Sequence, residues 1–532
     1  MILGALGLGA IALGVYSTAQ ALTFLPALDV RDPPLAAANT SPSAPSRRLT
    51  ERVVLIIVDG LRLDASRTMP SLARLRAAGI DAEAESHYPS LSRPNYVSIL
   101  AGVPPQWSGV RSNAYDQPVP LDSAPKRAKA AGLGVSFISQ VASGPRVMFG
   151  VHVDHAPIAP RAPDLEAAAL ASLYGPHDLV AVLIGAIDDA GHAHGGASEE
   201  YAAAVAWADA LIDRLLRRID LRRQTVIVVA DHGHIDDGGH GGLEPEVMAV
   251  PLVMAGAGIR PGAPLVRAQI IDVAPTVCAL LGLPMPRHAL GLALVEALDL
   301  EIAERDAIRR ADVVRIGALT AQIAVARAAA EDEAWATRIT RGGLALFVLA
   351  GLIALAVWAA RRRIVLIDLR VLLVAVPAFP LTFYVMVLSF EHMLTPSTIP
   401  AVGTLAPQLF AYGGLAALVH TAVGWIMVAH RSRPSDRVAA AAGLVLAGTV
   451  VTLVPAAIMW VVTGPPFTAR LPGPDALLLP PATYVAVACY CLGSLVFVGV
   501  EDVAFVRRRR RDARAAAARR DGAPAITPAP AP

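Results

Sequence analysis

Five long apolar segments near the C-terminal end of the chain limit most strongly what it can fold into. Each segment is long enough to cross the roughly 30 Å hydrocarbon core of a bilayer as a helix. Only helices and closed barrels satisfy all backbone polar groups in that environment. We therefore expect a five-helix transmembrane region over residues 342–505, with helices at residues 342–360, 371–390, 403–429, 438–463 and 476–500.

An apolar N-terminal segment supplies either a further span or a secretion signal. Residues 2–28 contain no charged side chain, so residues 1–28 are long enough for a transmembrane anchor. A cleaved signal peptide is the alternative, because the triplet AQA at residues 19–21 matches the small-residue pattern of a cleavage site. Both interpretations export the next part of the chain, which begins with a proline- and alanine-rich linker over residues 29–50.

The arginines predict how the spans are oriented. Three stretches on one predicted side hold four, three and eight arginines, namely residues 361–370, 430–437 and 507–520. The two loops on the other side, residues 391–402 and 464–475, hold only Arg470. By the positive-inside rule, both chain ends are cytoplasmic if the first span is retained, and the soluble domain lies outside. The basic tail, residues 506–532, is expected to be disordered.

Residues 51–300 have the pattern of an α/β domain. Three short apolar runs, residues 53–58, 179–187 and 226–230, end at Asp59, Asp188 and Asp231 respectively. Continuous rather than alternating hydrophobicity indicates strands that are buried on both faces, as in a mostly parallel sheet. Helical stretches at residues 71–78 and 199–216 supply crossovers, and residues 301–341 are expected to form a helical connector to the membrane.

Acidic side chains at three strand ends predict a shared site, because ligands in such sheets bind beyond the carboxyl ends of the strands. The third run continues into the sequence ADHGHIDDGGHGG, which contains Asp231, His232 and His240. A carboxylate and two imidazoles suit a divalent metal such as zinc, although a polar loop that caps the strand is the alternative. His192 follows Asp188 by four residues.

A serine motif adds a hydroxyl to these groups. Ser92 precedes Arg93, Pro94 and Asn95 at the start of a predicted helix, near backbone N–H groups and the positive helix end. By itself such a serine is more often an N-cap residue. The same chain also carries three strand-end acids and the Asp188 and His192 pair. For this reason we favour a functional role for the Ser92 hydroxyl over a role as N-cap.

The ordered motifs resemble the alkaline phosphatase superfamily. They are Val58-Asp59-Gly60, Ser92-Arg93-Pro94-Asn95, Asp188-Asp189-Ala190-Gly191-His192, Asp231-His232-Gly233 and His240. Within that superfamily the chain is similar to the type I phosphodiesterase and nucleotide pyrophosphatase group, and most similar to the ethanolamine phosphate transferases of glycolipid-anchor (GPI) synthesis. Residues 188–212, 240–259 and 272–286 carry the latter likeness. It implies an alkaline-phosphatase-like sheet between helices.

The resemblance also implies two zinc ions and roles for individual residues. One ion would be held by Asp188, His192 and His240, and the other by Asp59, Asp231, His232 and the Ser92 oxygen. Ser92 would attack phosphorus and become phosphorylated before a second alcohol or water takes the group. Asn95 would bind substrate by donating an amide hydrogen bond to a phosphate oxygen.

The chain departs from related families at several positions. Sulfatases carry an arginine where Tyr96 stands, which disfavours sulfate ester cleavage, and nucleotide pyrophosphatases usually carry threonine as the nucleophile. Four side chains near the predicted ligands match no family position and are either supporting partners or solvated loop residues: His194, His234, Asp236 and Asp237. His420, within a predicted span, is a functional candidate or a neutral histidine bonded to a neighbouring helix.

The sequence therefore predicts a membrane-bound phosphotransferase or phosphodiesterase that acts on a lipid-linked phosphodiester among membrane lipids. A hydrolase of soluble diesters is the alternative, and a non-catalytic membrane scaffold is a third hypothesis. A net charge of +2 gives no sign of a nucleic acid polymer as partner. Abundant arginine, alanine and proline suggest a bacterial cytoplasmic membrane, with the domain on its periplasmic or extracellular side. The oligomeric state stays open.

Overall fold

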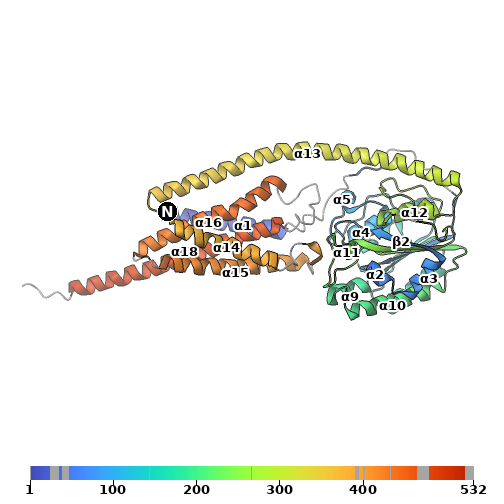
Figure 1. The fold of residues 1–532 in the computed structure, drawn as a ribbon, viewed down its shortest axis with the longest axis horizontal. Coiled ribbons are helices and arrows are strands. Elements are labelled where there is room, and N and C mark those ends of the chain that lie inside the picture. Colours follow the sequence, from blue (N-terminus) through green and yellow to red (C-terminus); the bar gives the residue numbers. More distant parts are fainter. Residues whose placement is uncertain are drawn as a thin grey trace, which may run out of the picture.

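The computed structural model describes residues 2–23, 35–38, 47–142, 144–264, 267–389, 395–398, 402–429, 431, 433–463 and 479–521. Most of the predicted linker, most of the two arginine-poor loops and the Ala-Pro end of the tail lie outside these residues. The described chain forms an α/β domain and a bundle of long helices, which a single long helix connects (Figure 1).

A seven-stranded sheet forms the centre of the α/β domain, with the order β3-β4-β1-β5-β6-β2-β7. The strands are β1 (Arg52–Val58), β2 (Gly79–Glu85), β3 (Val135–Ser139), β4 (Leu179–Ile184), β5 (Gln224–Val229), β6 (Ala249–Gly256) and β7 (Ala268–Gln269). β1 pairs in parallel with β4 and β5, whereas β6 is antiparallel to both β5 and β2. The predicted mostly parallel sheet is therefore confirmed.

Helices cover both faces of this sheet (Figure 1). One face carries α2 (Leu63–Ser66), α3 (Pro70–Ala78), α8 (Ala162–Tyr174), α9 (Ala186–His194) and α10 (Glu199–Leu216). The other carries α4 (Ser92–Ala101), α5 (Pro105–Ser108), α6 (Ala124–Ala130), α7 (Gly144–Phe149), the 3-10 helices η2 (Gly150–His152) and η3 (Ile270–Asp272), and α12 (Val273–Leu280). α11 (Pro245–Met248) and η4 (Val295–Ala297) complete the domain. Because helices cover both faces, every β4 residue is buried, as the continuous apolar pattern requires.

The second apolar run ends as a strand earlier than the sequence predicted. β4 ends at Ile184, and α9 begins at Ala186, so the prediction of a strand through residue 187 was wrong. Ile187 is fully buried, which explains why the apolar run continues past the strand into the first helical turn. Asp188 and His192 therefore lie one turn apart on the same face of a helix.

The membrane-type helices form a separate bundle. Within the described residues, five helices are long and apolar enough to cross a membrane, and Leu8–Thr23 is a shorter apolar helix. The helices are α1 (Ile2–Thr23), α13 (Ile302–Arg361), α14 (Leu369–Ser389), α15 (Val402–Ala429), α16 (Pro434–Thr463) and α18 (Leu479–Asp521). α13 runs without a break through both the predicted connector and the first predicted span. The boundary at residue 341 stays a prediction. α18 continues as a helix through Asp521, so the prediction of a disordered tail was wrong for residues 506–521, where alanine and arginine favour a helix.

His420 has a structural partner inside this bundle. Its Nδ1 donates a hydrogen bond to the Ala375 carbonyl oxygen of α14, at 2.9 Å. The Tyr490 ring lies beside it, with ring centroids 5.0 Å apart. This contact agrees with the interpretation of His420 as a histidine bonded to a neighbouring helix.

The arrangement of the two parts brings one edge of the sheet towards the membrane-type helices. Helices α4, α9 and α11 lie on the side of the α/β domain that faces the bundle (Figure 1). The N-terminal end of α1 and the basic end of α18 lie at the far end of the bundle. The edge of the sheet beyond the ends of β1 and β4 therefore faces the bundle.

Candidate metal and active site

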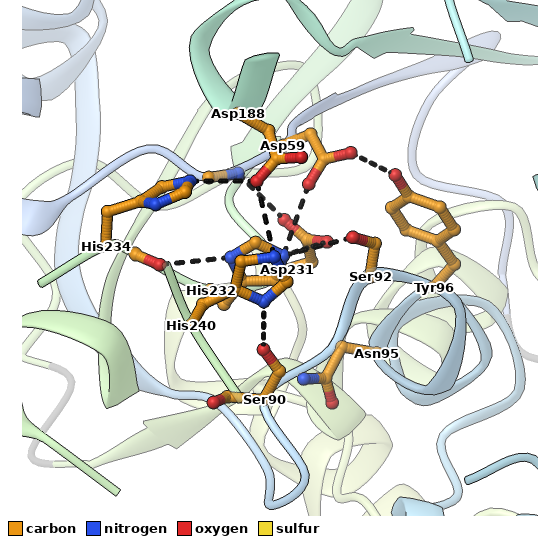
Figure 2. A network of polar contacts seen from close by, with 12 residues as sticks. Asp59, Ser90, Ser92, Asn95, Tyr96, Asp188, Asp231, His232, His234 and His240 are labelled. Atoms are coloured by element: carbon orange, nitrogen blue, oxygen red, sulfur yellow. Dashed lines mark hydrogen bonds and ion pairs between the residues drawn. The ribbon is translucent and has the colours of Figure 1, made fainter. Parts of the chain in front are cut away.

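Three neighbouring strands deliver three carboxylates to one edge of the sheet. Asp59 directly follows β1, and Asp231 comes shortly after β5, which is paired with β1 so that Ile57 lies opposite Val229. Asp188 comes from α9, which follows β4 on the other side of β1. The structure thus brings together the acids that the sequence placed at one edge (Figure 2).

Asp59, Asp231 and His232 form the first cluster of possible metal ligands. Their ligand atoms lie within 4.8 Å of one another, and all three residues are buried. His232 Nε2 lies 3.3 Å from Asp59 Oδ1 and 3.4 Å from Asp231 Oδ2. His232 Nδ1 lies 3.1 Å from the Gly233 carbonyl oxygen, to which a neutral ring would donate from this nitrogen. That tautomer leaves Nε2 with a free lone pair towards the cluster.

The first cluster has the chemistry of a divalent metal site. Asp59 Oδ1 and Asp231 Oδ2 are buried and accept no hydrogen bond within the described residues. Burial raises the pKa of both carboxyls well above the ordinary value, and the charges of Asp188 at Asp59 and of Asp59 at Asp231 add to the rise. A bound cation would satisfy both oxygens and offset their mutual repulsion. These residues therefore fit a divalent metal ion.

Asp188, His192 and His240 lie together in a second cluster. Asp188 Oδ1 is 3.5 Å from both His192 Nε2 and His240 Nε2, and the two ring nitrogens are 3.0 Å apart. His240 Nδ1 lies 2.7 Å from the Ser90 carbonyl oxygen, which leaves Nε2 facing the other two residues. Burial lowers the pKa of His240 well below its ordinary value, so the ring is neutral and able to bind a metal.

The two clusters adjoin each other rather than standing apart. The His232 and His240 rings are stacked, with centroids 3.6 Å apart. Ligand atoms of Asp188, His232 and His240 also lie within 4.8 Å of one another. The geometry accommodates metal near both clusters, and the division of ligands between two ions stays a prediction.

His234 contributes to the site in a way that the sequence left open. Its Nδ1 accepts a hydrogen bond from the Gly239 N–H at 3.0 Å, so its Nε2–H donates to Asp188 Oδ1 at 2.8 Å (Figure 2). A Cβ atom added at Gly191 would lie 2.7 Å from the His234 ring, so the glycine makes room for it. His234 therefore orients Asp188. The glycine between Asp188 and His192 was the only sequence signal for this contact.

The other three unassigned polar residues are exposed. His194 and Asp237 lie at the surface, and Asp236 forms an ion pair with Arg62 at 2.5 Å. The interpretation as a solvated loop residue agrees with the position of Asp237, whereas His194 is the last residue of α9 and Asp236 pairs with the largely buried Arg62.

Ser92 lies against the first cluster at the start of α4. The N-cap position belongs to Leu91, so the N-cap interpretation of Ser92 was wrong. Ser92 Oγ instead lies 3.2 Å from His232 Nε2. The side chain is close to the positive end of α4, where an approaching anion is stabilised. The hydroxyl therefore stands beside the candidate metal ligands.

Asn95 has its amide turned towards the backbone. Nδ2 donates to Ser86 Oγ at 3.1 Å and to the His87 carbonyl oxygen at 3.0 Å, and Oδ1 accepts from Ser98. Asn95 is fully buried one turn after Ser92. In this geometry its amide holds the Ser86 to Pro89 segment, and its contact with a phosphate oxygen stays a prediction.

Tyr96 makes a contact that the sequence did not predict. In the sequence, this residue was only an argument against sulfatase chemistry. The structure shows its hydroxyl donating a hydrogen bond to Asp59 Oδ2, and the side chain is fully buried (Figure 2). Burial raises the pKa of the Tyr96 hydroxyl well above its ordinary value, so the hydroxyl keeps its proton. Tyr96 therefore fixes one oxygen of Asp59 and leaves the other facing the cluster.

A protein-family model matches the part of the chain that carries most of the site. The family model described as type I phosphodiesterase / nucleotide pyrophosphatase matches residues 53–129 and 140–237. The predicted resemblance to this family is thereby confirmed. We call the α/β unit the phosphodiesterase-like domain. The matched residues include Asp59, Ser92, Asp188, Asp231 and His232.

Curated relatives match about half of the chain. The catalytic subunit of human GPI ethanolamine phosphate transferase 3 is 26% identical over 283 residues, which cover 46% of this chain and 26% of that protein. Human GPI ethanolamine phosphate transferase 1 is 24% identical over 327 residues, covering 50% and 35%. The chain therefore spans only about a quarter to a third of the length of these relatives.

Solved structures with low sequence identity align with about half of the chain. Human ectonucleotide pyrophosphatase / phosphodiesterase 5 aligns with a TM-score of 0.41 and 13% identity, covering 47% of this chain and 100% of that one. An alkaline phosphatase superfamily protein from Vibrio parahaemolyticus aligns with a TM-score of 0.38 and 15% identity, covering 54% and 80%.

Proposed function

We propose that this protein is a zinc-dependent phosphotransferase or phosphodiesterase that acts on a lipid-linked phosphodiester at the outer face of a membrane. One observation carries the chemistry: the Ser92 hydroxyl lies 3.2 Å from His232 Nε2, beside two buried carboxylate oxygens without hydrogen-bond donors among the described residues. A hydroxyl beside such ligands is the arrangement that phosphoryl transfer through a serine needs.

Different residues would bind the metal ions and attack the phosphorus. Asp59, Asp231 and His232 would hold one zinc ion, and Asp188, His192 and His240 the other. Bound zinc would lower the pKa of the Ser92 hydroxyl and stabilise charge on the phosphoryl oxygens. Ser92 Oγ would form a bond to phosphorus as the bond to the departing alcohol breaks, and the serine proton leaves with that alcohol or with solvent. An acceptor alcohol or water would then restore Ser92.

The position of the site supports a substrate in the membrane. The site edge of the sheet faces the bundle of apolar helices rather than the far side of the domain (Figure 1). The curated relatives are named as ethanolamine phosphate transferases. We therefore propose a phosphoethanolamine-type headgroup on a lipid as the donor and a glycolipid hydroxyl as the acceptor.

Vesicles of defined composition test this function. Full-length protein with zinc, in vesicles that contain phosphatidylethanolamine, is expected to release diacylglycerol. Vesicles of phosphatidylcholine alone provide the control for headgroup selectivity. Diacylglycerol release that is absent from every vesicle, in protein shown to contain zinc, would exclude this donor.

A hydrolase of soluble diesters is the second candidate function. It is supported by the family match, which lies wholly within the phosphodiesterase-like domain. Turnover of bis(4-nitrophenyl) phosphate that is fast in detergent and unaffected by added phosphatidylethanolamine would favour it. Competition between the two substrates would instead indicate that the lipid occupies the same site.

Replacing Tyr96 with phenylalanine should weaken zinc binding. Loss of the hydroxyl removes the donor to Asp59 Oδ2 and frees the carboxylate to rotate. Partners of this kind change metal affinity by about 10- to 100-fold. Chelator competition on the purified protein measures the change, with Tyr174→Phe at an exposed tyrosine as the matched control. Equal zinc affinity in Tyr96→Phe and Tyr174→Phe would show that the contact has no such role.

A further inference from the structure

A segment between two membrane-type helices reaches the phosphodiesterase-like domain. Thr395–Thr398 lies between α14 and α15 and includes the 3-10 helix η6 (Pro396–Thr398). Ser397 is fully buried although its segment belongs to the membrane-type part of the chain. Gly239 and Gly242, from the glycine-rich stretch that carries His240, contact it. The segment between α14 and α15 thus contacts the stretch of chain that carries His240, without touching the candidate ligands themselves in any contact of the described residues.

The contact is a closed set of hydrogen bonds around Glu244. The Gly242 N–H donates to Ser397 Oγ at 2.8 Å, and Ser397 Oγ donates to Glu244 Oε2 at 2.6 Å. The Thr395 hydroxyl donates to the other carboxylate oxygen, Glu244 Oε1. Each polar atom therefore has a partner, which is the condition under which buried polar contacts hold a loop in one conformation.

The glycines of this stretch allow the close approach. A Cβ atom at Gly239 would lie 1.9 Å from the Ser397 carbonyl oxygen, so no other residue fits there. Gly239 and Gly241 also have φ angles of +107° and +122°, which side chains other than glycine rarely adopt. Glycine-rich backbone is flexible unless contacts order it, so the conformation of this stretch depends on its neighbours.

His240 belongs to a stretch that contacts both this segment and Ser90. On the domain side, Ser90 Oγ donates to the Gly242 carbonyl oxygen at 2.8 Å and accepts from the Gly241 N–H at 2.9 Å. The Ser90 carbonyl oxygen lies 2.7 Å from His240 Nδ1. Ser90 thus holds the stretch from within the domain, and Ser397 holds it from the membrane-type part.

We propose that Thr395–Ser397 is a positioning element that holds His240 in its metal-binding position, so that the membrane helices help to build the site. The inference rests on the proposed function only where it treats His240 as a metal ligand. It follows that the helices do more than anchor the domain. A change in the spacing of α14 and α15 would reach the metal site through Ser397 and Glu244.

The test uses full-length Ser397→Ala in detergent, with two measurements. Hydrogen exchange at residues 239–242 is expected to become faster, because the Gly242 N–H loses its acceptor. Zinc retention against a chelator is expected to fall by about 10- to 100-fold for the more weakly held ion. Thr398→Ala is the matched control, because among the described residues its hydroxyl bonds to the Thr395 carbonyl oxygen, within the segment itself.

Glu244→Ala provides a second route to the same contact. If the segment and Glu244 act as one unit, the double variant should lose no more zinc affinity than either single variant. Exchange and zinc retention that match the wild type in both single variants would overturn the proposal. Equal effects of Thr398→Ala and Ser397→Ala would also overturn it, because the effect would then be a general loss of order.

The proposal and the proposed function fail in different ways. If Ser397→Ala and Glu244→Ala alter hydrogen exchange and zinc retention but the wild-type protein turns over no phosphodiester, the positioning role stands and the proposed function is rejected. Ser92-dependent turnover that is indifferent to both Ser397→Ala and Glu244→Ala, with unchanged exchange, would leave the function and reject the positioning role.

Discussion

Ser92→Ala is expected to lower kcat/KM for phosphodiester cleavage or transfer by about 10³-fold or more, because loss of a nucleophile removes the covalent route. Diacylglycerol release from phosphatidylethanolamine vesicles measures the loss. Ser92 Oγ has a single contact in the cluster, at 3.2 Å from His232 Nε2, while the carboxylates and imidazoles come from other elements. The variant should therefore retain zinc.

Ser92→Thr is the conservative partner of this variant. It keeps a hydroxyl but adds a methyl group at a position that is only 8% exposed. We expect intermediate activity, because crowding displaces the hydroxyl without removing it. Wild-type turnover in Ser92→Ala, with zinc retained, would contradict the serine mechanism. Full loss of zinc would instead show that Ser92 holds the metal site together.

Removal of zinc is expected to abolish activity and to destabilise the phosphodiesterase-like domain. A ligand at a thousandfold excess over its dissociation constant stabilises the folded state by about 4 kcal/mol per site. Thermal unfolding of the full-length protein with and without a chelator measures the loss. Restored activity on addition of zinc, but not of magnesium, is the expected control result, since nitrogen ligands favour zinc over magnesium.

The destabilisation should be greater at pH 8 than at pH 5. Burial raises the pKa values of Asp59 and Asp231 in the metal-free fold above those of the unfolded chain. Their protonation stabilises the metal-free fold at low pH, and this stability is lost as pH rises through the folded pKa values. The bonds and charges of nearby histidines lower the pKa of Asp188 despite its burial, so it titrates below this pH window. A chelator effect that is equal at both pH values would contradict this account.

Local sequence patterns predicted the strands that carry the site. The apolar runs before Asp59 and Asp231 became β1 and β5, because strands buried on both faces require continuous apolar side chains. The apolar run before Asp188 was predicted as one strand but forms β4 and the first turn of α9. A buried helical turn needs the same apolar residues as a buried strand. Hydrophobicity alone does not distinguish the two over so few residues.

The contacts that orient the ligands did not follow from the local sequence pattern. Tyr96 lies 37 positions from Asp59, and His234 lies 46 from Asp188, so no local period links either pair. The contact between Ser397 and Glu244 joins a membrane loop to the domain across 153 positions. Ligand types followed from motifs, whereas the residues that orient those ligands depend on how separate elements pack.

A structure of the full-length protein determined with anomalous scattering at the zinc absorption edge tests the central claim most directly. We expect two zinc peaks in each chain. One should lie against Asp59, Asp231 and His232 with Ser92 Oγ beside it, and the other against Asp188, His192 and His240. If no peak lies among these residues in protein that turns over a phosphodiester, the proposed two-zinc site is wrong.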